Sequence, residues 1–295
     1  MKKIFYLFAA TLILVAVGCS KDDAAQEEVK YVSEIKIGFE GDTRVTASQI
    51  AVGLKFAFED GEEICLNEYN PNRIGINIYY VYDASSKTFK AKYENYKLQE
   101  GKKYFAMAGN YLSISVKLDD TDNIIAQPSL NTMTGLSNIP MITDVFTASA
   151  DGTIATMHHL VGVVEVPVKL SEDSTDDTLD HIRLSGSRGI NLSGDMIATP
   201  AAPYLKEVKG GGDSTTSGEL DIKLSKDTAI SVFIPVLPGT YTDAITMNWY
   251  RSGDDTARSK ILGGTYSEPK TLVVERGKIT KVTEKAILLE KPVEE

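Results

Sequence analysis

Apolar and polar residues alternate with a period of two along most of the chain after residue 30. The first such run places Ile35, Ile37 and Phe39 between polar or small neighbours, and a second run, from Ile50 to Phe58, ends at Asp60-Gly61. Successive side chains of a strand point to opposite faces, so each run predicts a strand with one buried face. Further strands are predicted, on the same pattern or as short apolar runs, over residues 74–82, 89–96, 103–108 and 112–118.

The longest apolar run of the second half, from His158 to Leu170, predicts a strand with Val164, Val166 and Val168 on one face. Pro167 has no amide hydrogen to donate to a ladder, so it predicts an edge or a bulge. Later strands are predicted over residues 220–224, 230–236, 245–249, 270–275 and 278–288. Because no window has a helical period over three turns, we expect an all-β fold, most simply two β-sandwiches in tandem.

The expected domains are residues 31–172 and 173–295, since a chain of 295 residues is long for a single sandwich. The acidic, aperiodic segment from Ser171 to Thr178 is the candidate hinge. If the segments on either side of it instead pair as a hairpin, the boundary lies upstream, near residues 144–151.

The N-terminal residues 1–18 have the pattern of a lipoprotein signal peptide. Lys2 and Lys3 precede an apolar run from Ile4 to Val17, which would span about 21 Å as a helix and is too short to cross a bilayer. Small residues then lead to Cys19, the arrangement of a lipobox. We therefore expect cleavage before Cys19 and acylation of its thiol, with residues 19–30 as a polar tether.

Acylation of Cys19 would place the protein at the cell surface, anchored in the outer membrane by chains such as palmitate. Several acyl chains hold durably because each buried methylene contributes about 0.8 kcal/mol. The acidic residues that follow Cys19 are similar to the signal that exports lipoproteins of the Bacteroides group to the outer face, although a solvated tether would have the same composition. An incidental cysteine at an ordinary cleavage site is the alternative.

Charge and cysteine content exclude several classes. The formal charge of −10 becomes −12 once Lys2 and Lys3 are removed, which disfavours nucleic acid as a partner. With Cys19 acylated, Cys65 has no intramolecular partner for a disulfide, and its strand-like, acidic surroundings favour a buried structural thiol.

No motif predicts catalysis, a cofactor or a metal. The chain lacks a G-x-S-x-G elbow, and the adjacent His158 and His159 should point to opposite faces of a strand. The acidic segment 119–123 lacks the spacing of a calcium loop, and the carboxylate pairs at 62–63 and 254–255 have polar surroundings. We expect a protein that is not an enzyme, with a carbohydrate-active enzyme as the open alternative.

The chain resembles the fimbrillins, the type V pilus subunits and related adhesins of the Bacteroides group. The resemblance extends over nearly the whole mature chain, with Glu62 where the family usually has Asp. It rests on the lipobox and on the segments Thr43-Arg44, 58–64, 103–108, 159–168, 190–195, 233–241 and 277–279.

The resemblance implies two transthyretin-like β-sandwiches and assembly by donor-strand exchange. In that family a protease cuts after an arginine, here matched by Arg44, and so displaces an N-terminal strand, here Ile35, Ile37 and Phe39. The opened groove accepts a C-terminal strand of the next subunit, in which alternate side chains fill the groove. The matching donor residues here are Ile279, Val282, Ala286, Ile287 and Leu288, although their alternation is irregular. A terminal subunit that never donates is therefore the open variant.

The expected function is a fimbrial structural subunit or a fimbria-associated adhesin. Its expected partners are other fimbrial subunits and the outer membrane, and a surface glycan or protein of a host or another bacterium fits an adhesive role. Exposed tyrosines could stack on sugars, although their alternation with apolar residues equally suits a core role. The alternative function is thus a monomeric glycan-binding surface lipoprotein.

Overall fold

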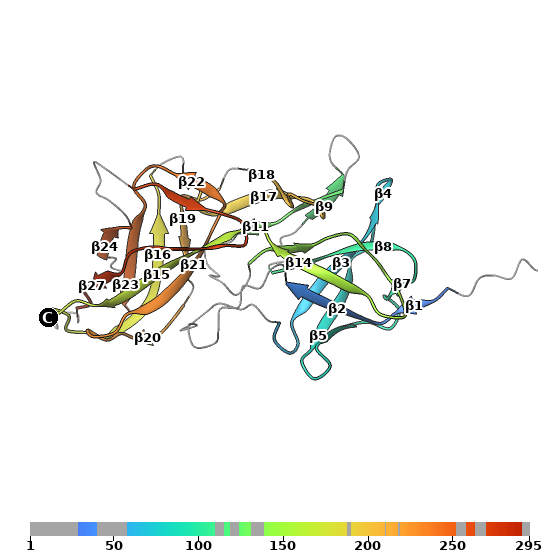
Figure 1. Cartoon of the computed structure of the whole chain (residues 1–295), viewed down its shortest axis with the longest axis horizontal. Helices are drawn as coiled ribbons and strands as arrows, with labels where there is room; N and C mark the ends of the chain where they lie inside the picture. The colour runs from blue at the N-terminus through green and yellow to red at the C-terminus, as the bar shows by residue number, and fades with distance from the viewer. Residues whose placement is uncertain are drawn as a thin grey trace, which may run out of the picture. The chain divides into compact units, whose positions relative to one another are not determined.

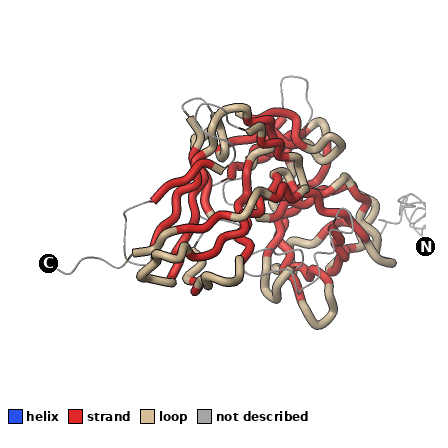
Figure 2. Tube along the Cα trace, turned by 60° about the vertical axis from the view of Figure 1, so that its left-hand side comes forward, coloured by secondary structure: helices blue, strands red, loops and turns tan. Residues whose placement is uncertain are grey.

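The computed structural model describes residues 29–39, 58–109, 115–118, 124–130, 139–187, 190–209, 211–217, 219–251, 258–262 and 270–290. Residues Met1–Lys30 and Tyr31–Glu295 form separate units. Within the described ranges every regular element is a strand, which confirms the all-β prediction (Figure 2). The predicted signal peptide, Cys19, Arg44, the acidic segments 119–123 and 254–255 and, apart from Phe58, the predicted second strand lie outside the described residues.

No helix among the described residues is long and apolar enough to span a membrane.

Seven strands in the described part of the chain pair side by side into a closed ring, which we call the barrel. β2 pairs in parallel with β14 and antiparallel with β6, and the ring closes where β8 pairs with β3. Because the ring is closed, each of the seven strands has a neighbouring strand on both sides. The order around the ring is β2 (Glu34–Phe39), β14 (Ile154–His159), β12 (Met141–Thr143), β8 (Lys103–Ala108), β3 (Glu63–Asn70), β5 (Ile78–Asp83) and β6 (Thr88–Ala91).

Short strands extend the barrel. β4 (Arg73–Ile74) pairs with β3, and β13 (Phe146–Thr147) pairs with β8. β1 (Tyr31–Val32) pairs with β7 (Leu98–Gln99). The interior core holds Val32, Ile35, Ile64, Leu66, Ile78, Tyr80, Phe89, Leu98, Tyr104, Ala106, Ala108, Phe146, Ala148, Ala155 and Met157.

The predicted continuous strand over residues 74–82 is wrong, because a β-bulge divides it. On β3, Tyr69 is opposite Ile74 and Leu66 is opposite Ile78, so three steps on β3 face four steps on the partner. One extra residue moves every later side chain to the other face. Ile74 and Ile76 are accordingly 48% and 64% exposed, whereas Ile78 is buried.

Two other predicted strands also differ in the structure. The strand expected over residues 89–96 ends at Ala91, and Tyr93 and Tyr96 belong to the loop before β7. The long strand expected from His158 to Leu170 is divided at Leu160-Val161 between β14 of the barrel and β15 (Gly162–Leu170) of another sheet. Both faces along this stretch are apolar, so the pattern alone does not reveal the division. The strand predicted over residues 103–108 is confirmed as β8.

A middle sheet combines strands from distant parts of the chain. Its central pair is β10 with β17, where Ala126 is opposite Ala198. The side chains beneath it form a middle cluster with the outer face of the barrel, to which Cys65, Phe105 and Met107 contribute. The members are β9 (Ser115–Leu118), β10 (Ile124–Gln127), β11 (Ser129–Leu130), β17 (Gly194–Ala198) and β18 (Leu205–Val208).

The remaining strands form a β-sandwich around β15 (Figure 1). Val164, Val166 and Val168 lie in the core between its sheets, which confirms the face predicted for them. One sheet contains β15, β21 (Ile230–Val236), β26 (Ile279–Lys281) and β27 (Lys285–Ile287). The other contains β16 (Thr178–Ser185), β19 (Ser214–Thr216), β20 (Ile222–Lys223), β23 (Thr246–Arg251) and β24 (Arg258–Ile261), and β22 (Gly239–Tyr241) pairs with β25 (Leu272–Val274).

The division into domains 31–172 and 173–295, or near residues 144–151, stays a prediction. The middle sheet draws strands from both sides of residue 172, and residues from Tyr31 onward group into one unit.

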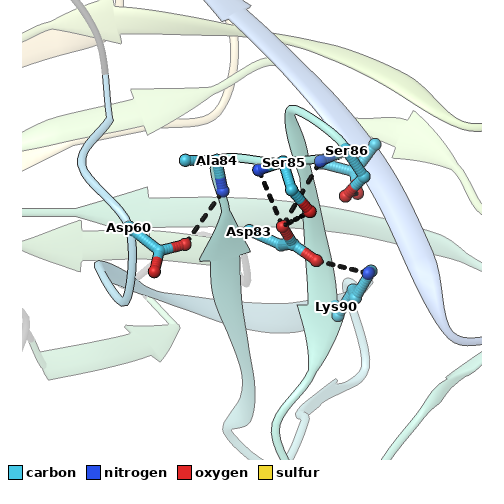
Figure 3. A network of polar contacts seen from close by, with 7 residues as sticks. Asp60, Asp83, Ala84, Ser85, Ser86 and Lys90 are labelled. Atoms are coloured by element: carbon cyan, nitrogen blue, oxygen red, sulfur yellow. Dashed lines mark hydrogen bonds and ion pairs between the residues drawn. The ribbon is translucent and has the colours of Figure 1, made fainter.

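A polar network holds the β5–β6 hairpin (Figure 3). Asp83 Oδ1 accepts the backbone N–H groups of Ser85 (2.8 Å) and Ser86 (3.3 Å), and its other oxygen pairs with the Lys90 ammonium. The Lys90 contact and these bonds lower the pKa of Asp83. Asp60 Oδ1 accepts the Ala84 N–H at 3.0 Å, which ties the hairpin to the turn before β3.

Tyr80→Phe is expected to lower the unfolding free energy by about 1–3 kcal/mol, because it leaves buried polar groups without a partner. The Tyr80 hydroxyl donates to the Val32 carbonyl and accepts the Leu98 N–H at 3.2 Å. Urea denaturation measures the change. Tyr82→Phe, on the same strand, is the matched control and should cost less than about 0.5 kcal/mol; equal costs for the two variants would contradict the role of the Tyr80 hydroxyl.

The unfolding free energy is also expected to fall as the pH rises above about 10. Burial raises the pKa of Tyr80 from 10.0 to about 12. A group whose folded pKa is raised contributes stability that is complete below the unfolded pKa and is lost as the pH approaches the folded value. Urea denaturation of the wild type from pH 9 to about 12 should therefore show a steeper decline than that of Tyr80→Phe; parallel declines would contradict this.

Candidate strand-exchange site

The predicted displaced strand is β2, one of the seven strands of the barrel. Ile35 is fully buried, and Ile37 and Phe39 are partly buried against the same interior core. Their spacing of two residues points all three side chains to one face. The residues singled out from the sequence are therefore the ones by which β2 fills the barrel.

Backbone hydrogen bonds hold β2 on both sides. The Lys36 N–H donates to the Thr153 carbonyl at 2.9 Å, and on the other side the Ala91 N–H donates to the Ser33 carbonyl at 2.8 Å. Ile37 lies opposite Ala155 of β14 in a parallel register. Removal of β2 would give β14 and β6 one unpaired edge each, with an apolar trough between them.

Aromatic rings anchor the end of β2. Phe39 stacks on Phe58 with 4.9 Å between ring centroids, and it also faces the His159 ring at 6.0 Å. Phe58 in turn contacts Phe89 edge to face at 4.7 Å. Loss of Phe39 would open an aromatic-lined hole at this end of the trough.

The other end of β2 borders an open cavity of about 480 Å³. Residues 31–36 line one wall, and residues 150–154 with Thr88 line the rest. Ile154, the first residue of β14, is 76% exposed at this position. Solvent therefore reaches the start of β2 beside its parallel partner.

The predicted donor residues lie in β26, β27 and the segments that follow them, parallel to β15 at the end of their sheet. Val163 is opposite Ile279, and Leu170 is opposite Ile287. Ile287 is fully buried, whereas Ile279, Val282, Ala286 and Leu288 are partly buried. The candidate donor thus occupies its own sandwich within this chain.

Pro167 explains the irregular alternation of the donor segment. The Val163 N–H donates to Lys278 and the Ser171 N–H to Ile287, so odd-numbered amides of β15 face the C-terminal strands. The nitrogen of Pro167 also faces the C-terminal strands, but it carries no hydrogen to donate to them. It lies opposite the break between β26 and β27. The predicted edge or bulge is not found in β15 itself, which is internal and pairs with β21 in an unbroken register. The strand on the side that the Pro167 nitrogen faces is interrupted instead.

The far end of the C-terminal segment is firmly held. Trp249 Nε1 donates to the Leu288 carbonyl at 2.9 Å, and the Thr175 N–H donates to the Leu289 carbonyl at 2.9 Å. The Leu289 side chain is buried in the sandwich core. Release of this strand would have to break these contacts.

The structure places the two predicted exchange segments in different sheets and does not bring them together. β2 belongs to the barrel, and β26 and β27 belong to the sandwich. A contact between these segments would therefore join two copies. Arg44 and Cys19 lie outside the described residues, so their roles stay predictions.

His158 belongs to a polar cluster that the sequence does not reveal. His158 Nε2 lies 3.0 Å from Asp144 Oδ2, and the Tyr204 hydroxyl donates to Asp144 Oδ1 at 2.7 Å. The Tyr204 ring stacks on His158 at 3.8 Å, and the Arg276 guanidinium lies 4.8 Å from the Tyr204 ring centroid. Asp144 and Tyr204 are 60 residues apart, and no spacing motif connects them.

The cluster joins β14, the loop before β18 and the turn after β25. His158 is buried, whereas the His159 ring stacks on Phe39 from the opposite face of the strand, as predicted. Within the described ranges, no group of three or more His, Cys, Asp or Glu residues could hold a metal ion. Cys65 is a buried free thiol, and burial raises its pKa to about 12, so the thiolate is scarce at neutral pH.

Comparison of the fold with solved structures gives several matches. A protein of Bacteroides uniformis provisionally assigned to cell adhesion is 12% identical, with a TM-score of 0.51 over 78% of this chain and 88% of that one. A second such protein, from Bacteroides ovatus, is 11% identical with the same TM-score over 90% of this chain and 99% of that one. A fimbrial protein of Bacteroides ovatus is 9% identical, with a TM-score of 0.42 over 90% of this chain and 51% of that one.

The chain therefore has the fold of Bacteroides proteins assigned to cell adhesion, as expected from its resemblance to the fimbrillins. At these identities the likeness concerns the fold. No family model and no curated protein matches the sequence.

Ile35→Ala is expected to lower the unfolding free energy by about 2–5 kcal/mol, because it leaves a cavity inside the barrel. It should also speed hydrogen exchange of the β2 amides relative to the sandwich. Chemical denaturation and exchange measured by mass spectrometry test both effects. Lys36→Ala, an exposed neighbour on the same strand, should change the stability by less than about 0.5 kcal/mol; the same loss in both variants would contradict the assignment of Ile35 as an anchor.

Proposed function

We propose that this protein is a surface-exposed lipoprotein subunit or adhesin of a fimbria, and that it assembles by strand exchange at the barrel. The observation that carries the proposal is the position of β2. It completes a closed barrel from an N-terminal segment and pairs in parallel with β14. Its removal would expose two sheet edges and an apolar trough, which a strand from another subunit could fill.

The contacts that β2 makes in this structure define which side chains an incoming strand would need. Positions equivalent to Ile35, Ile37 and Phe39 would need apolar side chains, and the residues between them would face outward. Main-chain hydrogen bonds to β14 and β6 would hold any such strand, while the trough would select its alternate side chains.

A cut after Arg44 would separate β2, still joined to the tether, from the rest of the barrel in one step. The acyl anchor at Cys19 would leave with the same fragment. Whether the cut occurs therefore distinguishes a polymerising subunit from a permanently anchored one.

Donation by the C-terminal strand is the second half of the proposed exchange. Two features favour release: β26 and β27 end their sheet, and Pro167 interrupts their ladder. The burial of Ile287 and Leu289 opposes it. We therefore expect this chain to accept a strand more readily than it donates one.

We also propose that the protein has no catalytic activity and needs no cofactor. His158 and the Tyr204 hydroxyl each contact one oxygen of the Asp144 carboxylate, which argues against Asp144 as a catalytic base. The low thiolate content of Cys65 argues against this residue as a nucleophile. Proteins with catalytic pairs instead hold a base near an activated nucleophile.

Protein lacking residues 1–19 should lose residues 20–44 when it is treated with an arginine-specific protease and should then form a ladder of oligomers. The physical reason is that displacement of β2 exposes edges that pair with other copies. Mass spectrometry gives the cut position, and size-exclusion chromatography gives the oligomers. Arg44→Lys is the matched control, because it keeps the charge and resists the protease.

A synthetic peptide of residues 31–44 should suppress the ladder by refilling the trough, whereas the same peptide with Ile35→Asp and Ile37→Asp should not. A cut protein that stays monomeric without the peptide would contradict strand exchange by this chain alone. Oligomers that form equally in Arg44→Lys would contradict the role of the cut.

A further inference from the structure

Tyr93 and Tyr96 form an exposed aromatic pair on the loop between β6 and β7. Their side chains are 48% and 51% exposed, and the ring centroids lie 6.4 Å apart with the ring planes 80° from parallel. No role in assembly follows from this pair, because it belongs neither to the trough nor to the sandwich.

The loop holds the pair in a defined geometry. The Tyr96 N–H donates to the Tyr93 carbonyl at 3.1 Å and closes a turn. The Lys92 ammonium lies 5.5 Å from the Tyr93 ring centroid and pairs with Glu63 of β3. The turn and the edge-to-face contact thus place the two rings side by side before any ligand arrives, which lowers the entropic cost of binding.

The charges around the pair balance. Lys92 pairs with Glu63, and Lys97 pairs with Glu94 at 2.5 Å. The loop therefore offers apolar ring surface and hydrogen-bonding groups without a net charge. This combination suits a neutral ligand with an apolar face and many hydroxyl groups better than it suits an anion or a cation.

The size of the pair also limits the ligand. A tyrosine buries roughly 150–250 Å² when fully covered, so two half-exposed rings offer about 200 Å² in all. A stable protein interface needs about 800 Å² from each partner. One or two sugar rings match the smaller area.

We propose that Tyr93 and Tyr96 form a carbohydrate-stacking site for neutral pyranose rings, in which the axial C–H face of a sugar lies on an aromatic ring. Glu94 and Asn95, which lie between the two tyrosines in the sequence and are exposed, would supply hydrogen-bonding groups for sugar hydroxyls. An open site of this size should bind one oligosaccharide with a dissociation constant on the order of 1 mM. Many copies on a surface would strengthen attachment through avidity.

The site is independent of strand exchange, and only the gain from avidity rests on the proposed surface role. The test therefore uses monomeric, uncut protein lacking residues 1–19. If the protein fails to form oligomers by strand exchange, the outcome of this sugar-binding test is unchanged.

Three neutral hexasaccharides serve as probes: β-1,4-linked glucose, α-1,4-linked glucose and β-1,4-linked mannose. Saturation-transfer NMR detects binding, and amide shifts of residues 92–97 locate it. We expect at least one probe to bind the wild type and to shift these amides. Tyr93→Ala with Tyr96→Ala should weaken that binding at least about tenfold, whereas the double change to Phe should keep it within about threefold, since the ring faces remain.

Tyr31→Ala is the matched control, because Tyr31 is 59% exposed and lies outside the pair. It should bind as the wild type does, and thermal unfolding should confirm that all variants fold. The proposal is overturned if no probe binds the wild type, if Tyr31→Ala is impaired to the same extent, or if the Phe variant loses binding as fully as the Ala variant.

Discussion

Closure of the barrel by β2 is the constraint on which the rest of the N-terminal structure depends. The ring of seven described strands stays closed as long as β2, a segment of six residues, remains between β14 and β6. Without β2 the ring would have two free edges. Apolar burial of Ile35 and Phe39 and two ladders of backbone bonds hold that segment. The same contacts that stabilise the isolated chain therefore define what an incoming strand would have to replace.

The middle cluster connects this barrel to the remaining strands. β3 and β8 bury both faces, one inside the barrel and one against the middle sheet. Next to this cluster, polar contacts connect Asp144 with His158 and Tyr204, and the Arg276 guanidinium lies over the Tyr204 ring. A buried polar group is tolerated when it has a hydrogen-bond partner. The buried His158 side chain has one in the Asp144 carboxylate, which is itself half exposed.

In the sandwich, Pro167 determines where the C-terminal strands can pair with β15. A missing amide hydrogen inside a central strand would normally leave a neighbour unsatisfied, and here the neighbour is interrupted at that position. The C-terminal segment is consequently weakest in its middle and strongest at its buried end. This distribution of contacts bears on how readily the segment could leave its own sheet.

The period of two in the sequence was sufficient to predict an all-β chain, the buried face of β2 and the face of β15 that lies in the sandwich core, because alternation depends only on the local geometry of a strand. Strand β8 was predicted from a short apolar run, and it buries both faces. It failed at residues 74–78, where one bulged residue exchanges inside and outside, and at Leu160-Val161, where both faces are apolar. The closed ring, the parallel pairing of β2 with β14 and the cluster around Asp144 were decided by tertiary structure alone. Those contacts join residues far apart in the chain, and no local pattern records which distant strand will supply the missing hydrogen bonds.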